Sequence, residues 1–233
     1  MNHPLNKYLA QAGVTSRRKA VDLIKSGAVT VNNHVVKEPY HQVSSDDTIK
    51  VNGALIHQII VKHVFILNKP KGYITTTSDD RKRRTVMDLF VDIKERLFPI
   101  GRLDKDTTGV LLITNDGDLA HKLSHPRYEV AKVYDVVLDR PFEHRDYELI
   151  KRGLRLSDGI IKVDHIVYRK HSKKVRLSLH SGKNRIVRRI FEHIGYEVKA
   201  LDRKAYAGLT HFGLARGAWR SLTKQEHSKL TAR

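Results

Sequence analysis

The sequence predicts an α+β protein in which a larger domain, built on a mixed or antiparallel sheet, follows a small α/β module at the N-terminus. From residue 64 onward, apolar runs of strand length and stretches of alternating polarity dominate, with few helical patterns between them. Such a pattern favours a sheet with helices packed on it. Before residue 64, apolar residues recur at helical spacing in two consecutive segments, and a hairpin pattern follows them.

The first sixty residues predict two helices followed by a hairpin. Gly13 and Gly27 can each end a helix, and Ser16 can cap the start of the second one. The apolar residues at helical spacing before and after this cap are Leu5, Leu9, Ala12, Ala20, Val21 and Ile24. Asn32 and Asn33 separate two short apolar runs, and asparagine tolerates the positive φ of a tight hairpin. A module of this size lies near the lower limit for an independent core.

We therefore divide the chain into residues 1–60 and 61–233, with residues 53–63 as a connection that is not fully flexible because it contains apolar residues. In the larger domain, the predicted strands are residues 64–67, 110–114, 130–138 and 175–179. Helices are expected near residues 117–124, 143–152 and 184–194. Thr223 begins a capping box that opens a last helix.

The charge balance indicates a nucleic-acid partner. The 233 residues include 44 Lys and Arg against 25 Asp and Glu, a formal net charge of +19. An excess of this size creates a positive field that attracts polyanions. The sequence shows no amphipathic anchor or long apolar span, and its N-terminus lacks the profile of a signal peptide. We therefore expect a cytoplasmic monomer with no membrane partner.

The sequence contains no cysteine, which excludes disulfides, thiolate catalysis and zinc sites built on cysteine. Its 14 histidines are scattered, without an HExxH pattern or a tight cluster. We interpret them as surface and RNA-facing residues, and we expect no metal.

Basic residues concentrate on the two N-terminal helices: Lys7, Arg17, Arg18, Lys19 and Lys25. Positive charge on a rigid surface suits phosphate binding. The order and spacing within LNKYLAQAGVTSRRKAVDLIKSGAVTVN resemble the S4 RNA-binding module, closely over residues 3–32 and loosely over the hairpin. The resemblance implies that Arg17, Arg18 and Lys19 contact RNA. A generic small helical domain with a basic face is the alternative interpretation.

The segment GRLDKDTTG, residues 101–109, stands out in the larger domain. Two glycines bracket an acidic, hydroxyl-rich loop that leads directly into a predicted strand. By composition alone, an Asx-rich turn is the ordinary interpretation. Metal binding by Asp104 and Asp106 is another, although two carboxylates without further ligands make a weak site.

This segment resembles the catalytic motif of pseudouridine synthases, specifically the branch that has an N-terminal S4 module and modifies ribosomal RNA. Three further stretches resemble motifs of the same family in the same order: NKPKGY at residues 68–73, KVY at 132–134 and SGKNRIVRR at 181–189. The resemblance spans nearly the whole chain. One motif alone would carry modest weight, whereas four in order make a strong case.

The resemblance implies a reaction that breaks the N1–C1′ bond of a uridine and rejoins C1′ to C5, without cofactor or metal. Such a reaction needs an ionised carboxylate and an enclosed site that retains the freed uracil. Asp104 matches the carboxylate, which could attack the sugar, attack the base or remove a sugar proton. Arg188 matches the guanidinium that favours the ionised carboxylate, and Val187 matches the buttress beneath it. Without the motif, Arg188 would be interpreted as a solvated or phosphate-binding arginine.

The same resemblance makes Tyr134 the ring that stacks on the target base, although composition alone would place this tyrosine in the core. An enzyme that acts on a stacked base must first extrude it, and Arg102 matches the side chain that fills the gap. We interpret Lys69 and Lys71 as phosphate contacts. The run of basic residues at 81–84 is interpreted as a phosphate contact or as a solvated loop tip.

Two other functions compete with this one. A non-catalytic RNA-binding factor in ribosome assembly explains the charge and the S4-like module, but not the joint occurrence of Asp104, Tyr134 and Arg188. A nuclease using Asp104 and Asp106 would require a divalent metal or a paired acid and base. The expected partner is ribosomal RNA or a ribosome-assembly intermediate. The segments HPRYEV and GKNRIVRR resemble the part of the branch that modifies large-subunit RNA. The resemblance therefore favours large-subunit over small-subunit RNA as the substrate, and the small-subunit RNA stays an alternative.

Overall fold

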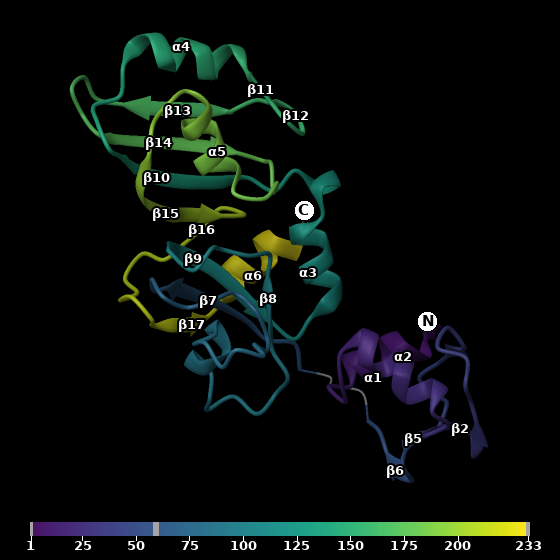
Figure 1. Cartoon of the computed structure of the whole chain (residues 1–233). Coiled ribbons are helices and arrows are strands. Elements are labelled where there is room, and N and C mark those ends of the chain that lie inside the picture. The colour runs from purple at the N-terminus through teal and green to yellow at the C-terminus, as the bar shows by residue number, and fades with distance from the viewer. Residues whose placement is uncertain (1, 58–60, 232–233) are drawn as a thin grey trace. The chain divides into compact units, whose positions relative to one another are not determined.

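The computed structural model describes residues 2–57 and 61–231, which include part of the expected connection at 53–63. The chain forms two compact units (Figure 1). The smaller one contains the N-terminal residues up to His63 together with Lys94–Arg96 and Asn115–Gly117, and the larger one contains the rest. None of the helices in the described part of the chain has the length and apolarity needed to cross a lipid bilayer.

The smaller unit contains the helix pair and hairpin that the sequence predicted. Its helices are α1 (Leu5–Gln11) and α2 (Arg17–Lys25), and its main sheet has the order β3-β2-β5-β6. These strands are β2 (Val29–Val31), β3 (His34–Val35), β5 (Ile49–Val51) and β6 (Ala54–Leu55), and a separate pair consists of β1 (His3–Pro4) and β4 (Gln42–Val43). The Ser16 hydroxyl accepts a hydrogen bond from the Lys19 amide at 3.2 Å, so the predicted helix cap is confirmed.

Local backbone geometry sets the boundaries of these elements. Gly13 and Gly27 have φ values of 76° and 82°, beyond the ends of the two helices. Asn32 and Asn33, at 51° and 67°, make the hairpin turn between β2 and β3. Leu5, Leu9, Ala20 and Ile24 from the helices pack with Val29, Val31 and Ile49 from the sheet, which gives this unit its own core.

The larger unit is built on a nine-stranded mixed sheet. Seven strands follow the order β13-β14-β10-β15-β9-β7-β17, and β16 and β8 pair with β15 and β9. Their bounds are β7 (Val64–Lys69), β8 (Phe98–Ile100), β9 (Thr107–Thr114), β10 (Lys132–Leu138), β13 (His165–Tyr168), β14 (Lys174–Leu179), β15 (Val198–Tyr206), β16 (Leu209–Thr210) and β17 (Trp219–Ser221). All four predicted strands lie in this sheet, as β7, β9, β10 and β14. Every pairing is antiparallel except that of β15 with β9, so the predicted α+β class with a mixed sheet is confirmed.

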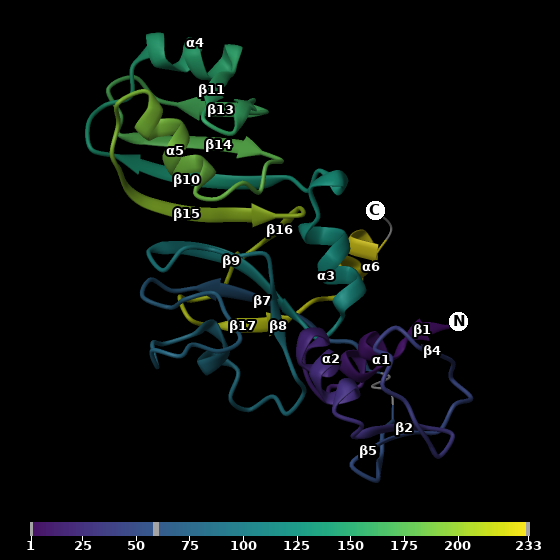
Figure 2. The same cartoon turned by 45° about the vertical axis from the view of Figure 1, so that its right-hand side comes forward.

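Helices cover the two halves of this sheet on different faces. The two near β10, β13 and β14 are α4 (His144–Arg152) and α5 (Ile186–His193), whereas α3 (Gly117–Ser124) and α6 (Lys224–Thr231) lie beside β8 and β9 (Figures 1 and 2). Short elements complete the unit: η1 (Val86–Leu89), η2 (Pro126–Tyr128) and the hairpin of β11 (Leu154–Leu156) with β12 (Gly159–Ile161). Thr223 and Glu226 exchange side-chain to backbone hydrogen bonds of 2.9 and 3.2 Å, which confirms the predicted capping box.

The helices bury alternate residues of the strands, as the pleat requires. Tyr134, Val136 and Leu138 of β10 face the same core as Ile186 and Ile190 of α5. A second core, on the other face, joins Ile66, Val110 and Leu112 to Leu123 of α3 and Leu230 of α6.

One glycine brings the two central strands into close contact. Gly109 lies in register with Arg203 where β9 and β15 run parallel, and its φ is 104°. A Cβ atom at this position would lie 2.2 Å from the Arg203 carbonyl oxygen, a separation that no side chain can adopt. The loop at residues 101–109 is thereby held directly against β15.

Candidate active site

A cavity of about 140 Å³ opens between the loop at residues 101–107, strands β10 and β15, and the start of α5. Among the residues that line it are Asp104 and Arg102 from the loop, Tyr134 from β10, and Val187 from α5. The structure therefore brings together four of the side chains that the sequence predicted for the site, from three separate motifs.

Lys69 supports the loop at residues 101–107 that carries Asp104. Its side chain is fully buried, and its Nζ donates to the carbonyl oxygens of Pro70, Asp104, Lys105 and Thr107 at 3.0–3.3 Å. Burial lowers the pKa of Lys69 to about 8, and the charges of Asp106 and Asp104 oppose that shift. The sequence-based prediction of a phosphate contact at Lys69 is wrong, because RNA cannot reach an ammonium group that is enclosed by the loop it supports.

Thr75 provides a second support for the same loop, which the sequence did not reveal. Its hydroxyl donates to the Leu103 carbonyl at 2.7 Å and accepts from the Leu103 amide at 3.3 Å. Both backbone polar groups of Leu103, the residue before Asp104, are therefore hydrogen-bonded to one side chain, which preorganises the position of the carboxylate.

Two arginines approach Asp104. Its Oδ2 atom lies 3.6 Å from Nη1 of Arg185 and 4.0 Å from Nε of Arg188. The Arg188 side chain is 12% exposed, and its Nη1 donates to the Val198 carbonyl at 2.9 Å, which ties it to β15. Sequence reasoning selected Arg188 and missed Arg185, which is the nearer of the two. Arg185 precedes α5 with a left-handed φ of 48°, a conformation that no local signal in the sequence indicates.

Tyr134 and Val187 are buried, with 7% and 3% of their surfaces exposed, and both line the cavity. Arg102 lines the cavity and is exposed to solvent. Lys71 is 70% exposed and lies 4.0 Å from Asp106, outside the set of lining residues.

Two further cationic side chains line the cavity, Lys132 of β10 and Arg203 of β15, which the sequence analysis did not select. Lys132 donates to the carbonyls of Val130 and His180, both at 2.8 Å, and burial lowers its pKa to about 8. Arg203 is 2% exposed. Nothing in the sequence distinguishes them, since a charged residue in an alternating strand normally faces solvent.

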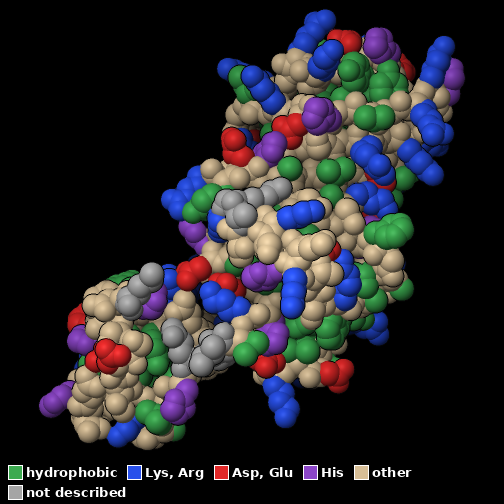
Figure 3. All heavy atoms as spheres, turned by 180° about the vertical axis from the view of Figure 1, so that it is seen from behind, with side chains coloured by type: hydrophobic (Ala, Val, Ile, Leu, Met, Phe, Trp, Pro, Cys, Tyr) green, Lys and Arg blue, Asp and Glu red, His purple; other side chains and the backbone are tan. Residues whose placement is uncertain are grey.

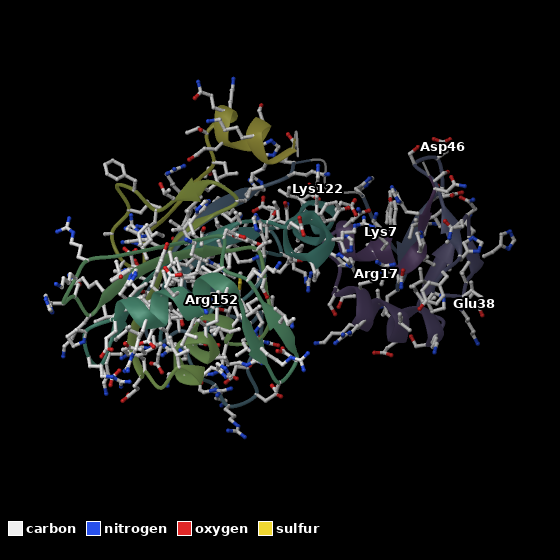
Figure 4. The ribbon with its side chains drawn as sticks, turned by 90° about the horizontal axis from the view of Figure 1, so that it is seen from above. Lys7, Arg17, Glu38, Asp46, Lys122 and Arg152 are labelled. Atoms are coloured by element: carbon white, nitrogen blue, oxygen red, sulfur yellow. The ribbon has the colours of Figure 1, made fainter. Side chains whose placement is uncertain are left out.

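The remaining basic residues lie on surfaces. Arg17, Arg18 and Lys19 are exposed in the first turn of α2, in the smaller unit. Within that unit, Lys7 and Arg17 lie on one side and Glu38 and Asp46 on the opposite side (Figure 4). Lys and Arg side chains are also spread over one face of the larger unit, where Asp and Glu are sparse (Figure 3).

The basic run at residues 81–84 is partly neutralised. Arg83 pairs with Asp79 at 2.6 Å, and the hydrogen bonds from Arg83 lower the pKa of Asp79 to about 2. Asp106, the other carboxylate of the catalytic loop, is 64% exposed beside Lys71. Within residues 2–57 and 61–231, no three His, Asp or Glu side chains gather in a group that could hold a metal ion.

Comparisons with known proteins agree with this geometry. Residues 63–193 match the family described as RNA pseudouridylate synthase, and residues 4–49 match the S4 domain. The chain is 43% identical to "Ribosomal large subunit pseudouridine synthase B" of Bacillus subtilis (strain 168), over 98% of this chain and 95% of the relative. It is 37% identical to "Dual-specificity RNA pseudouridine synthase RluF" of Escherichia coli (strain K12), over 95% of this chain and 76% of the relative.

A solved structure described as "Crystal structure of pseudouridylate synthase" shares the fold, with a TM-score of 0.71 and 29% identity over 98% of this chain and 99% of that one. The chain therefore belongs to the RNA pseudouridine synthase family, in a form that carries an S4 domain. It is an isomerase of uridine in RNA, and this membership favours the catalytic interpretation over a non-catalytic RNA-binding factor.

Proposed function

We propose that the enzyme converts uridine to pseudouridine in ribosomal RNA, and that Asp104 is its catalytic carboxylate. The observation that carries the proposal is the position of Asp104 in the cavity, within 4.0 Å of two arginines and on a loop fixed by buried Lys69. The two guanidinium groups complement the negative charge of the carboxylate and can help to orient it. The name of the Bacillus subtilis relative supports RNA of the large ribosomal subunit as the substrate.

The cavity suits a single extruded nucleotide. Arg102, exposed at its rim, fills the space that the target uridine leaves in the RNA. Tyr134 stacks against the uracil ring, and Val187 supports the opposite wall. Breaking the N1–C1′ bond inside this enclosure keeps the uracil close to the sugar, so that the ring can turn and present C5 to C1′. The Asp104 oxygen supplies the negative charge for the first step.

We also propose a division of labour between residues 1–60, which bind RNA, and residues 61–233, which perform the chemistry. The exposed cations Arg17, Arg18 and Lys19 support the first role, because charges on a rigid helix can neutralise phosphates without reaching the cavity. A ribosomal substrate, free or within an assembly intermediate, implies that the enzyme works in the cytoplasm.

The decisive test is Asp104→Asn, which keeps the size of the side chain and removes its charge. Release of tritium from RNA containing 5-tritiated uridine reports the reaction directly, because forming the C5–C1′ bond expels that hydrogen. We expect tritium release to fall to background, whereas RNA affinity should stay within about tenfold of the original value because a carboxylate contributes little to docking a polyanion.

Asp106→Asn is the matched control, since this second carboxylate of the same loop is exposed and, unlike Asp104, has no ion pair with Arg185 or Arg188. It should retain measurable turnover. Substantial tritium release by Asp104→Asn, or complete loss only in Asp106→Asn, would overturn the assignment.

The target uridine is identified by comparing ribosomal RNA from strains with and without the gene. Carbodiimide-dependent primer extension stops at pseudouridines, so the stop that disappears on deletion marks the site. Loss of a stop in small-subunit RNA alone would contradict the preference for the large subunit.

A further inference from the structure

The cavity floor holds two cations that lack an anionic partner. In the part of the chain that the structure describes, no carboxylate oxygen lies within 4.0 Å of the Lys132 ammonium or the Arg203 guanidinium. The hydrogen bonds of both end on backbone carbonyls, Val130 and His180 for Lys132 and Val110 for Arg203. The Nη2 atom of Arg203 is buried with no partner at all.

Several more exposed arginines of this unit are paired with carboxylates. Three of them make two-pronged hydrogen bonds to a carboxylate: Arg176 to Asp135, Arg189 to Asp158 and Arg220 to Glu226. All three are more exposed than Arg203, so solvent would stabilise them even without a partner. Arg203 is 2% exposed, so an isolated charge is costly there, yet no carboxylate of the described residues lies within 4.0 Å of it.

Strand register places these cations against the proposed base site. Arg203 is the cross-strand partner of Tyr134 on β10 and of Gly109 on β9, so it lies between the stacking ring and the end of the catalytic loop. Lys132 is the cross-strand partner of Tyr206. Both cations approach the Tyr206 ring, with Nζ of Lys132 at 5.7 Å and Cζ of Arg203 at 4.6 Å from its centroid.

The ring and strand backbone around these cations are fixed. The Tyr206 hydroxyl donates to the Leu123 carbonyl at 2.7 Å, and Nε of Arg203 donates to the Val110 carbonyl at 2.7 Å. A third polar group, the Thr107 hydroxyl, lines the same cavity and is buried without a partner. The floor is therefore a preorganised set of donors that awaits an acceptor.

Two anionic groups of the RNA could meet these cations, a backbone phosphate or the uracil base, and the position of the cations favours the base. Backbone phosphates stay at the surface when a nucleotide enters a pocket base first, and exposed Lys71 is better placed for them. A group that reaches Arg203, 2% exposed beside Tyr134, must belong to the base. Uracil becomes an anion only during the reaction, and its charge then resides largely on the carbonyl oxygens.

We propose that Lys132 and Arg203 form a cationic floor that stabilises the negative charge on the uracil ring while it is detached from the sugar. This inference rests on the function proposed above. The electron pair of the N1–C1′ bond passes to the ring, where O2 and O4 share it, and C1′ is compensated by bonding to the Asp104 carboxylate or by losing a sugar proton to it. The C5–C1′ bond then forms as the Asp104–C1′ bond breaks and frees the carboxylate or, on the other route, as Asp104 returns the proton to the sugar. C5 finally loses its hydrogen as a proton and N1 gains one, so nothing is oxidised or reduced.

Single-turnover rates at saturating RNA test the floor in the full-length chain. Lys132→Met and Arg203→Met remove the charges, and each should slow tritium release about 100-fold while RNA affinity changes less than about threefold. Lys132→Arg and Arg203→Lys keep the charge and should recover most of the rate. If Arg203→Met does not fold, the Lys132 pair decides the outcome alone, because Lys132 lies at the edge of the floor.

A second substrate separates charge stabilisation from structural damage. RNA with 5-fluorouridine at the target carries an electron-withdrawing atom that stabilises the ring anion by itself, and nucleoside mass spectrometry measures its consumption. The ratio of the original chain's single-turnover rate to that of each Met variant should be at least about tenfold smaller on this RNA than on RNA with uridine. Three outcomes would overturn the proposal of a cationic floor. The Met variants could be equally slow on both RNAs, Lys132→Arg could be as slow as Lys132→Met, or the variants could lose RNA affinity alone.

Asp104→Asn distinguishes the two proposals. It should be inactive on both RNAs whatever the floor does, and activity in this variant would overturn the proposed function itself. Inactive Asp104→Asn together with full rates in both Met variants would overturn the cationic floor alone.

Discussion

The cations of the smaller unit and those around the cavity are placed in opposite ways. On α2, Arg17, Arg18 and Lys19 are exposed to solvent, whereas Lys69 and Arg203 are almost completely buried. Exposed charges act through water and are screened by salt, while buried charges act at short range in a poorly screened environment. The comparison indicates that the cations behind a net charge of +19 suit two separable roles, which we propose to be docking RNA and arranging chemistry.

The largest effect should come from removing a buried cation that no RNA touches. Lys69→Met leaves three carbonyls of the loop, and that of Pro70, without their donor, so the segment that carries Asp104 loses its anchor. We expect the single-turnover rate to fall at least about 100-fold, since small displacements of a reacting group cost that much. Tritium release at saturating RNA measures it.

Lys71→Met is the matched control, because Lys71 lies two residues away with 70% of its side chain exposed. It should change RNA affinity slightly and leave the rate at saturation unaltered. Equal losses in the two variants would contradict the distinction between buried and exposed cations.

Exposed cations should affect affinity instead. In the triple variant Arg17→Ala, Arg18→Ala and Lys19→Ala, the dissociation constant for RNA should rise about tenfold or more. The slope of log affinity against log salt concentration should become shallower by about 2. Each phosphate contact that is lost no longer releases its counter-ion on binding. Fluorescence titrations between low and high salt measure both quantities.

Glu38→Ala, on the opposite side of the same unit in Figure 4, is the control and should leave the salt slope unchanged. A triple variant with an unaltered slope and a reduced rate at saturation would show that α2 contributes to chemistry rather than docking.

The same contrast explains what the sequence could predict. The helices of the smaller unit, their Ser16 cap and the Asn32–Asn33 turn depend on neighbouring residues, and all three were predicted. The strands β7, β9, β10 and β14 followed from apolar runs and alternation, but the parallel contact of β15 with β9 joins distant segments and left no local signal. A close approach at Gly109 is visible only once both strands are placed.

Site residues divide in the same way. Asp104, Tyr134 and Arg188 were selected because motifs resemble a family, and composition alone favoured ordinary roles for each. Lys69 and Lys71 look alike in the sequence, yet the pleat of β7 and the fold of the loop bury one and expose the other. Arg203 reaches the site only through its register with Tyr134, which no spacing along the chain encodes.

The smallest effect, and the one that tests the buried cations most specifically, is on pH dependence. Burial and the charge of Arg203 lower the pKa of Lys132 from 10.5 to about 8, and Asp164, which also faces His180, opposes the shift. Lys132 is therefore charged at pH 7 and largely neutral at pH 9. Because the single-turnover rate depends on the charged form, it should fall up to about tenfold between these values.

Stability should move in the opposite direction. A lysine whose folded pKa lies below its unfolded value leaves the unfolded chain with more bound protons between about pH 8 and 10, so the free energy of unfolding rises with pH across that window. Lys69 titrates in the same range, but its neutral amine still donates to the loop carbonyls. Lys132→Arg should retain its rate to higher pH than the original chain. Parallel pH series of tritium release and denaturant unfolding measure the two trends, and a rate that falls together with stability would show that unfolding, not loss of the Lys132 charge, limits activity.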